Sequence, residues 1–356
     1  MLLSFSIPTH HGRADTLARA LDSVLEQVTP ELRSSVQICV SDNASQDATQ
    51  QVLAERRARH GSLLVYHRNL HDLGLVPNLL HSVAMADGEF CWLLGSDDVI
   101  VEGALEQVIS LLREHPDVGG ITLNRLRVDP RNPGWSQSDP PDELPEDPEQ
   151  VHIYDSAGEI FRNVGLSHDY MSTQVINRRV WTEALEGIND EDLTYAQGLA
   201  HLYVMGKMVE RHPRWIWYPG QLVRHTIGTS ALDDELGNRY AEYLLVIMEG
   251  RSRVWSRLFA GNTPLYRQVM EKAHRRGARP TALIGIKLWG AQSVRQDVRL
   301  LVQLTRHFYW LPRFWRVTFP LLLVPHQGFK LLSRMKWAAL GRVGHLRARR
   351  GSHPGP

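Results

Sequence analysis

Residues 90–98 read FCWLLGSDD, a short apolar run that ends in a glycine, a serine and two aspartates. A run of this length with a turn signal behind it is typical of a buried strand. Similar runs precede it at Leu2–Ile7, Val36–Ser41 and Ser62–His67. Apolar residues at helical spacing predict helices over Ala14–Val28, Gln46–Arg59, Val76–Ala86 and Glu102–Glu114. Strands that alternate with helices predict an α/β fold with a mainly parallel sheet.

A polar turn follows each predicted strand. These turns are Pro8–Gly12, Asp42–Ser45, Arg68–Gly74 and Gly95–Asp98. Parallel sheets bind ligands beyond the carboxyl ends of their strands, so we expect the turns to form one candidate surface. Adjacent carboxylates such as Asp97 and Asp98 favour a cation, and oxygen ligands suit Mg²⁺ or Mn²⁺. The alternatives are a helix N-cap for the acidic pair and a side-chain-to-backbone turn for Asp42–Ser45.

Three blocks of sequence resemble glycosyltransferase family 2 in order and spacing. They read SIPTHHGRADTLARALDSVLEQ from residue 6, VSDNASQDAT from residue 40, and HDLGLVPNLLHSVAMADGEFCWLLGSDD from residue 71. The resemblance implies a GT-A fold, in which a Rossmann-like nucleotide-binding α/β half merges into an acceptor-binding half. It also implies transfer of a sugar from a nucleoside-diphosphate sugar, usually with a divalent metal.

The resemblance assigns roles to residues of the strand-end turns. Pro8, Thr9 and His10 match the first-strand turn that borders the nucleoside, Asp42 matches the acid that accepts a hydrogen bond from the base, and Arg68 contacts base or phosphate. Asp98 matches the direct metal ligand, and Asp97 is expected nearer the ribose with a share in the metal; Ser96 is grouped with the nucleotide contacts. Many relatives place another Asp at the position of Gly95.

The resemblance leaves the catalytic base open. Relatives commonly take this base from a Glu-Asp pair, but the matching positions here are Gln197 and Gly198. We expect Asp192 or Glu191 to replace it; His201 and the pair His168-Asp169 are alternatives, as is a solvated, helix-capping role for the acidic cluster. Arg224-His225 resembles the place where relatives put basic residues near the diphosphate, and a structural histidine is the alternative.

The rest of the chain supplies an acceptor half and an extension. Residues 129–150, rich in Pro and acid, predict a loop. Short elements are expected at Phe161–Val164, Thr173–Ile176 and Ile216–Tyr218, and helices at Leu193–Met208 and Asn238–Leu258. We therefore predict a nucleotide-sugar half at 1–125, an acceptor half at 126–235 and a mainly helical extension at 236–356.

Composition excludes several classes of protein. With 22% charged and 43% hydrophobic residues, the chain is not wholly disordered. Its 2 cysteines cannot form a disulfide framework or a four-cysteine zinc site, which favours a reducing compartment. No apolar run is long enough for a conventional spanning helix, and the start MLLSFSIPTHH does not resemble a signal peptide.

The formal net charge of +1 hides an uneven distribution. Residues 281–356 contain thirteen Lys and Arg but only one acid, Asp297, so this part carries +12 and residues 1–280 carry −11. Aromatic residues interleave with the arginines in HFYWLPRFWRVTF, from residue 307, which is typical of segments in a membrane interface. A helical bundle on the catalytic domain and an interface in a homo-oligomer are the alternatives. No nucleic-acid module is recognisable.

Taken together, these patterns predict a metal-dependent glycosyltransferase of O-antigen or related surface-polysaccharide assembly. The expected cofactor is Mn²⁺ or Mg²⁺, the donor a nucleoside-diphosphate sugar, and the acceptor a lipid-linked saccharide. The expected location is cytoplasmic, peripheral at the cytoplasmic face of the inner membrane, with an anionic membrane surface as partner. The family implies inversion. Transfer to a soluble or protein acceptor, and a catalytically inactive nucleotide-sugar-binding relative, are the alternatives.

Overall fold

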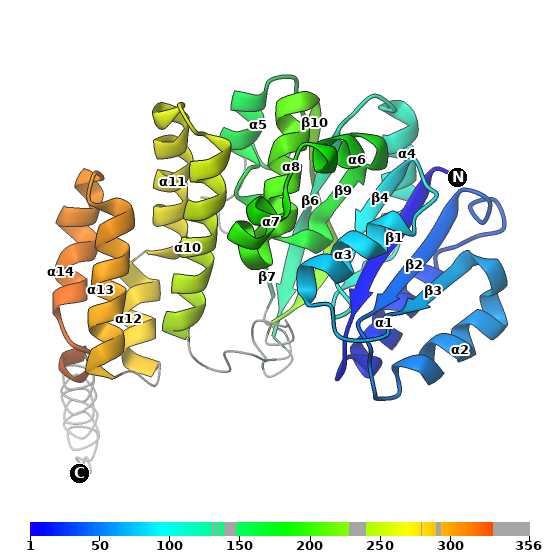
Figure 1. The fold of residues 1–356 in the computed structure, drawn as a ribbon, viewed down its shortest axis with the longest axis horizontal. Coiled ribbons are helices and arrows are strands. Elements are labelled where there is room, and N and C mark those ends of the chain that lie inside the picture. The colour runs from blue at the N-terminus through cyan, green and yellow to red at the C-terminus, as the bar shows by residue number, and fades with distance from the viewer. Residues whose placement is uncertain are drawn as a thin grey trace, which may run out of the picture. The chain divides into compact units, whose positions relative to one another are not determined.

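The computed structural model describes residues 1–129, 132, 134, 136–138, 147–227, 240–278, 280–289 and 293–329. Two compact units make up the chain (Figure 1). The first comprises Met1–Ala231 with Gly250–Lys272, and the second comprises Leu232–Glu249 with Ala273–Pro356. The division into a nucleotide half and an acceptor half stays a prediction.

The first unit contains one mixed sheet. Its strands are β1 (Leu3–Thr9), β2 (Val36–Asp42), β3 (Leu64–Arg68), β4 (Phe90–Leu93), β5 (Val99–Ile100), β6 (Gly120–Val128), β7 (Ser136–Ser138), β8 (His152–Tyr154), β9 (Gln174–Asn177) and β10 (Trp215–Thr226). Their order is β3-β2-β1-β4-β9-β6-β10-β5, with β7 beside β6 and β8 beside β10. The first four strands are parallel, whereas β9 is antiparallel to β4 and β6. The predicted α/β fold is confirmed.

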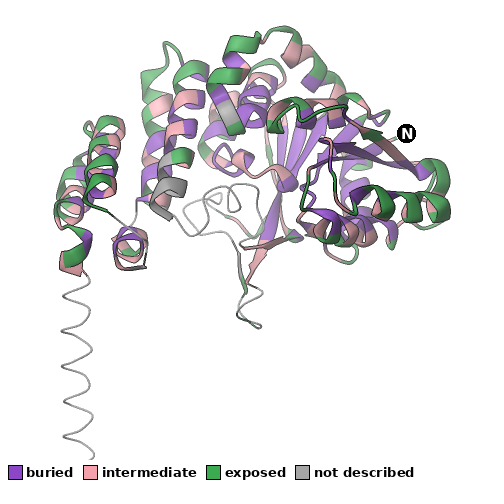
Figure 2. Ribbon diagram, turned by 60° about the horizontal axis from the view of Figure 1, so that its bottom comes forward, coloured by how far each residue is buried: buried purple, intermediate pink, exposed green. Residues whose placement is uncertain are grey.

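Helices of the first unit cover both faces of its sheet (Figure 1). The helices of the first 231 residues are α1 (Ala14–Leu25), α2 (Thr49–His60), α3 (Leu75–Ala84), α4 (Ala104–Glu114), α5 (Ala157–Asn163), α6 (Arg178–Glu186), α7 (Asp190–Ala196) and α8 (Ala200–Arg211). Those that follow are α10 (Tyr240–Leu258), α11 (Thr263–Gly277), α12 (Pro280–Trp289), α13 (Val294–Phe308) and α14 (Phe319–Leu323). Figure 2 shows the strands largely buried and the outer helix faces exposed.

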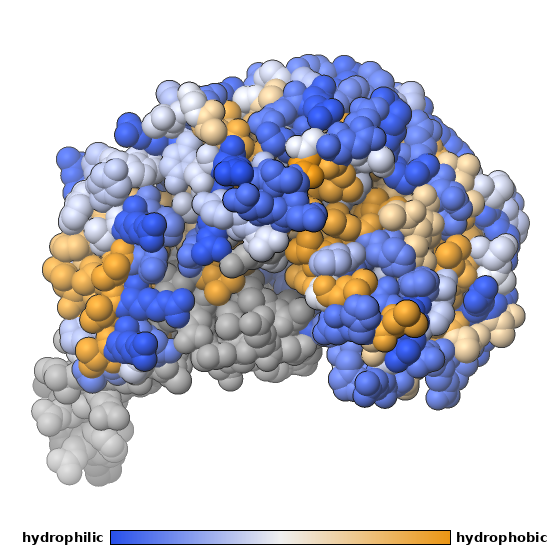
Figure 3. All heavy atoms as spheres, viewed as in Figure 1, coloured by the Kyte–Doolittle hydropathy of each residue, from blue (hydrophilic) through white to orange (hydrophobic). Residues whose placement is uncertain are grey.

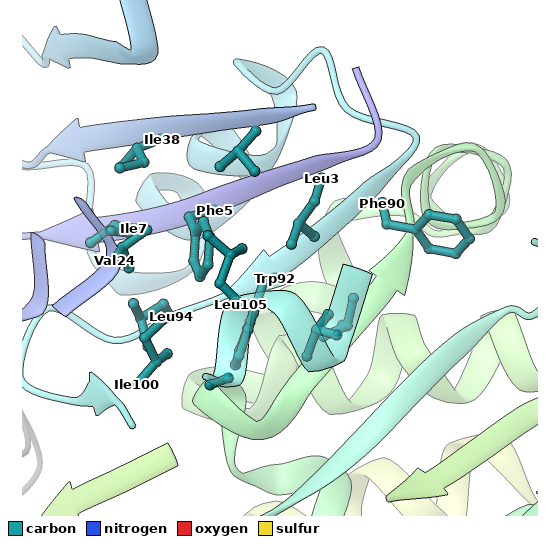
Figure 4. Close-up of a cluster of buried hydrophobic side chains, with 14 of the residues drawn as sticks. Leu3, Phe5, Ile7, Val24, Ile38, Phe90, Trp92, Leu94, Ile100 and Leu105 are labelled. Atoms are coloured by element: carbon teal, nitrogen blue, oxygen red, sulfur yellow. The ribbon is translucent and has the colours of Figure 1, made fainter. Parts of the chain in front are cut away.

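The hydrophobic core lies between one sheet face and helices α1 and α4 (Figure 4). Phe5 of β1 stacks on Trp92 of β4, with ring centroids 5.1 Å apart. Leu105 of α4 and Val24 of α1 belong to the same cluster. Leu3, Phe5 and Ile7 of β1 all enter this core, which explains why the sequence pattern identified the strand.

The opposite face of the parallel strands carries smaller and polar side chains. Ser41 of β2 donates a hydrogen bond to Asn78 of α3, at 2.7 Å. Asn78 in turn donates to the carbonyls of Thr9 and Ser41, at 3.0 and 3.1 Å. The start of α3 is therefore fixed to the carboxyl ends of β1 and β2, where the candidate surface was predicted.

Several predicted elements differ from the structure. The single helix over Leu193–Met208 is wrong: α7 and α8 are separated by a 3₁₀ turn at Gln197–Leu199, which contains the poor helix former Gly198. Within the predicted loop 129–150, β7 pairs with β6. The remaining positions of that loop include residues outside the described ranges.

The second unit is helical around a buried ionic cluster. The Lys287 side chain is fully buried, lies 3.2 Å from an Asp297 carboxylate oxygen, and donates to the carbonyls of Leu322 and Val324. The imidazole of His326 lies 2.7 Å from the other Asp297 oxygen. Asp297, the only acid in the basic part of the chain, therefore has its charge paired inside the unit.

The aromatic residues of this unit are divided between core and surface. Phe308 and Phe314 are fully buried, and both pack edge-on against His274, at 4.7 and 6.2 Å. Tyr309 and Trp315 are exposed. Part of the stretch that resembled an interfacial segment therefore forms a helical core. Among the described residues, no helix combines the length and hydropathy needed to cross a bilayer.

Candidate active site

The strand register brings the residues that are predicted to contact the nucleotide into one row. Thr9 of β1 is paired with Asp42 of β2, and Asp42 is paired with Arg68 of β3. The backbone N–H of Leu94, at the end of β4, donates to the carbonyl of Ser6, at 3.1 Å. The carboxyl ends of the four parallel strands therefore meet at one edge.

Asp97 and Asp98 lie in a tight turn that follows β4. The turn is closed by the Asp98 N–H, which donates to the Gly95 carbonyl at 3.2 Å. The chain then forms β5, and α4 begins only at Ala104, with Gly103 as its N-cap. The N-cap alternative for the acidic pair is therefore wrong.

The carboxylate of Asp98 is held by three side chains from the other half of the sheet. Its Oδ2 accepts hydrogen bonds from the Tyr170 hydroxyl, at 2.6 Å, and from the Ser172 hydroxyl. Its Oδ1 lies 3.1 Å from Nδ1 of His225, which also contacts the Tyr170 hydroxyl. The guanidinium of Arg125 lies 3.6 Å from the centre of the Tyr170 ring. Asp98 is consequently buried and oriented from several directions.

Crowding around residue 95 explains why this chain has glycine where relatives place an Asp. A Cβ there would lie 3.0 Å from Asp97 Oδ1, 3.1 Å from the Ser172 hydroxyl and 3.3 Å from Asp98 Oδ2. The Gly95 N–H also donates to the Ser172 hydroxyl, at 2.9 Å. Glycine therefore allows the two aspartates and Ser172 to approach one another closely.

The electrostatics of the acidic pair fit a divalent cation. Burial, and then the nearby charge of Asp98, raise the pKa of Asp97 above its ordinary value, although Arg13 lies 3.9 Å away. Among the described residues, no three His, Cys, Asp or Glu side chains form a cage for a metal. Mg²⁺ commonly takes one or two carboxylates and completes its coordination with water and substrate phosphates. Asp97 and Asp98 fit that arrangement.

Asp42 and Arg68 lie in the row of strand-end residues, but both already have hydrogen-bond partners within the protein. Asp42 is fully buried; its Oδ1 accepts from the Ser45 N–H and its Oδ2 from the Tyr66 hydroxyl, both at 2.9 Å. Arg68 lies 3.8 Å from Asp42 and donates to the Ser45 carbonyl. The side-chain-to-backbone turn is therefore present, and contact of Asp42 with a base stays a prediction.

The remaining nucleotide candidates lie at the ends of β1 and β4. Pro8 is paired with Ser41 in the sheet. Thr9 is buried, and its hydroxyl has no hydrogen-bond partner among the described residues. His10 is half-buried and accepts a hydrogen bond from Arg13 at 3.3 Å, whereas Ser96 is buried. Their contacts with a nucleotide stay predictions.

The base candidates are distributed around α7 and α8. Asp192, in the first turn of α7, is paired with Arg257, whose Nε lies 2.7 Å and whose Nη2 lies 2.6 Å from its Oδ1. Glu191 is exposed. A Cβ on Gly198, one of the positions matching the family's Glu-Asp pair, would lie 4.0 Å from Leu75 at the start of α3. That turn therefore lies beside the helix that follows the third strand-end turn.

Two of the alternative base candidates already have polar partners, and the third is fully buried. Asp169 forms an ion pair with Arg251, whose Nε donates to it at 3.0 Å. His201 lies 3.0 Å from the Asp169 carbonyl. His168 is fully buried, and burial lowers its pKa to about 3. These contacts favour structural roles for all three residues.

Sequence reasoning missed Tyr170, Ser172 and Arg125. Tyr170 lies between two short 3₁₀ turns, and Ser172 lies in the second of them. Neither has a local motif, because their partner Asp98 is more than seventy residues away along the chain. The resemblance predicts His225 near the diphosphate; in the structure it lies beside Asp98, the carboxylate predicted to bind the metal.

Comparison with known proteins agrees with this arrangement. A family model described as Glycosyl transferase family 2 matches residues 4–183. Over 219 residues the chain is 29% identical to the abequosyltransferase RfbV of Salmonella typhimurium, across 58% of this chain and 60% of that protein. Over 127 residues it is 27% identical to the poly(ribitol-phosphate) beta-glucosyltransferase of Bacillus spizizenii, across 36% of this chain and 19% of that protein.

Two solved structures share the fold at low sequence identity. S. aureus TarS 1-349 in complex with UDP-GlcNAc has a TM-score of 0.60 at 13% identity, across 88% of this chain and 82% of that chain. The mannosyltransferase PcManGT from Pyrobaculum calidifontis, in complex with GDP-Man and Mn²⁺, has a TM-score of 0.53 at 15% identity, across 92% and 86%. With a family model that covers half of its length and a fold shared with glycosyltransferases, the chain belongs to glycosyltransferase family 2.

Proposed function

We propose that this chain transfers a sugar from a nucleoside-diphosphate sugar to a saccharide acceptor in surface-polysaccharide assembly, with Mn²⁺ or Mg²⁺ as cofactor. The observation that carries the proposal is the half-buried Asp97 beside the buried Asp98 at the shared edge of the parallel strands, with Asp98 oriented by Tyr170, Ser172 and His225. Relatives named for transfer of abequose and glucose, and neighbours bound to UDP-GlcNAc or to GDP-Man with Mn²⁺, support it.

Some residues of the site would bind the cation, and others orient the residues that bind it. Asp98 and Asp97 would hold the cation, which when bound stabilises the negative charge that develops on the departing diphosphate. Burial and the charge of Asp98 raise the pKa of Tyr170, so its hydroxyl stays protonated and continues to donate to Asp98. The turns after β1, β2 and β3 then bind the nucleoside beside this pair.

The acceptor side of the proposal rests on α7. An inverting transfer needs a base within reach of the acceptor hydroxyl. Between the two predicted candidates, Glu191 is exposed, whereas Asp192 is paired with Arg257. We assign the base to this acidic turn and the acceptor to a lipid-linked saccharide at the cytoplasmic face of the inner membrane.

A turnover assay with a set of nucleoside-diphosphate sugars tests this proposal. Release of the nucleoside diphosphate should require Mn²⁺ or Mg²⁺, stop on addition of a chelator, and fall at least a hundredfold in Asp98→Asn, on the order of magnitude expected when an electrostatic contact of the transition state is removed. Asp15→Asn, an exposed aspartate of α1, is the matched control. Turnover that stays at the wild-type level both in Asp98→Asn and in the presence of the chelator would overturn the metal assignment.

A second candidate function has its own supporting observation. Gln197 and Gly198 stand where relatives carry the Glu-Asp pair. A protein that binds the donor without turnover does not need the base that this pair supplies. Such a protein would bind the donor in the presence of Mn²⁺ and release no nucleoside diphosphate with any acceptor. Turnover that falls in Glu191→Gln or Asp192→Asn excludes this candidate.

A further inference from the structure

Helix α13 presents an exposed apolar stripe to solvent. Val294, Val298 and Val302, each four residues from the next, are 58%, 53% and 55% exposed. Another side of the helix, centred about 120° away around the axis, is buried through Leu300, Leu304 and other residues and already supplies the contacts with the core. Valine is also a weaker helix former than alanine. The stripe therefore has no evident role in the stability of the unit.

A basic stripe runs beside the apolar one. Arg295, Arg299 and Arg306 are exposed, and at 100° per residue their positions lie next to the valines around the helix. Arg313 and Arg316, just beyond the helix, are exposed as well. Figure 3 shows apolar atoms beside hydrophilic ones over α13 and α14. The outer face of α13 is thus both apolar and basic.

The buried ionic cluster keeps this face free of negative charge. Asp297 is the only acid between residues 273 and 329. Its carboxylate points into the unit, toward Lys287 and His326, at 3.2 and 2.7 Å. The exposed arginines of α13 are consequently not neutralised by an acid of their own segment.

Exposed aromatic and aliphatic residues extend the same character beyond α13. Tyr309 is 63% exposed, Trp315 44% and Leu323 58%. Tyrosine and tryptophan favour surfaces where one end of the ring is apolar and the other is hydrated. By contrast, Phe308 and Phe314, which belong to the aromatic stretch, are fully buried and cannot reach a partner.

We propose that the outer face of α13, with Tyr309 and Trp315, docks the chain on an anionic lipid bilayer. A bilayer with anionic headgroups offers negative charge and apolar depth together, which is what adjacent arginine and valine stripes require. Residues 330–356 do not fit as the occupant, because this segment carries seven Lys and Arg and no acid. The proposal deepens the proposed function, since it rests on an acceptor that is lipid-linked.

The test is flotation of the full-length chain with vesicles of phosphatidylcholine and 30% phosphatidylglycerol. Each basic residue near an anionic surface contributes about fivefold in binding, so Arg295→Gln, Arg299→Gln and Arg306→Gln together should weaken binding about 100-fold. Replacement of the three valines by serine should weaken it at least tenfold. Pure phosphatidylcholine or high salt should release the wild-type chain.

The matched control removes three positive charges from another part of the chain. Arg19→Gln, Arg57→Gln and Arg59→Gln change exposed arginines of α1 and α2 and should leave binding within a few-fold of wild type. Absence of wild-type binding, or an equal loss in the control, overturns the proposal. A loss of self-association in the α13 variant without a loss of vesicle binding also overturns it, because a second copy would then be the partner. Donor turnover in solution should be the same in all variants, which separates this test from that of the proposed function.

Discussion

Ser172→Ala removes one of the hydroxyl groups that hold the Asp98 carboxylate. Ser172 is buried and donates to Asp98 Oδ2, while it accepts from the Gly95 N–H at 2.9 Å. The substitution deletes one oxygen and leaves the backbone path unchanged. A hydrogen bond to a charged group contributes about 1.5–3 kcal/mol, which corresponds to about 10- to 150-fold in affinity. Loss of a partner that orients a metal ligand commonly costs about 10- to 100-fold in metal affinity.

We therefore expect Ser172→Ala to weaken Mn²⁺ binding about 10- to 100-fold in the presence of a nucleoside diphosphate. Tyr170→Phe, which keeps the ring under Arg125 and removes only the hydroxyl, should have an effect of similar size. Electron paramagnetic resonance of free Mn²⁺ measures the affinity without any need for turnover. Raising the Mn²⁺ concentration should restore donor turnover in both variants.

Ser110→Ala is the matched control, because Ser110 is an exposed serine of α4 whose hydroxyl donates to Glu114 of the same helix. Its Mn²⁺ affinity should equal that of the wild type. If folded Ser172→Ala and Tyr170→Phe also bind Mn²⁺ as the wild type does, Asp98 is not a metal ligand oriented by these hydroxyls, and the reasoning is refuted.

Three further predictions concern the fold. Gly120→Ala should lower the free energy of unfolding by about 1–3 kcal/mol, because its Cβ would lie 2.5 Å from the Trp215 ring and 2.8 Å from the Val175 carbonyl. Gly198→Ala is the control. Equal urea midpoints for Gly120→Ala and the wild type would contradict the packing. Burial lowers the pKa of His168 to about 3, despite the opposing charge of Asp169, whereas an unfolded histidine titrates near about 6.5. The unfolded chain therefore binds the extra proton between these values, so from pH 6 to 4 wild-type stability should fall by about 1.4 kcal/mol per pH unit more steeply than that of His168→Gln, and parallel profiles would argue against a neutral His168. Burial raises the pKa of Cys39 and Cys91 to about 12, so a disulfide reagent at pH 8 should find no reactive thiol in the folded chain and both after unfolding; fast reaction of the folded chain would show that β2 or β4 opens.

The first four strands and their helices could be predicted because their signals are local. β1, β2 and β4 are short, fully buried runs, β3 at the sheet edge is partly buried, and each run is followed by a polar turn. The other half of the sheet gave weaker signals. β5 has only two residues, and its partner β10 lies more than a hundred residues further along the chain. Nothing in the local sequence encodes such a pairing, so mixed topology could not be predicted.

The candidate site divides in the same way. Asp97, Asp98 and Asp42 could be found because they follow strands directly, and the register confirms that the parallel strand ends meet. Tyr170, Ser172 and Arg125 come from distant turns and strands and reach Asp98 or its neighbour only in the folded chain. The composition of the carboxyl-terminal part indicated a basic, aromatic surface, but it could not show that Phe308 and Phe314 face inward while the valines of α13 face outward.

Binding of a nucleoside diphosphate to the purified chain, followed by calorimetry with and without Mn²⁺, tests the central claim most directly. The account predicts that at least one nucleoside diphosphate binds only with Mn²⁺ or Mg²⁺, that Asp98→Asn abolishes this binding without loss of the folded state, and that Asp15→Asn retains it. Binding that is equal in Asp98→Asn and independent of the cation would contradict the assignment of the Asp97-Asp98 turn as the site that holds the donor diphosphate.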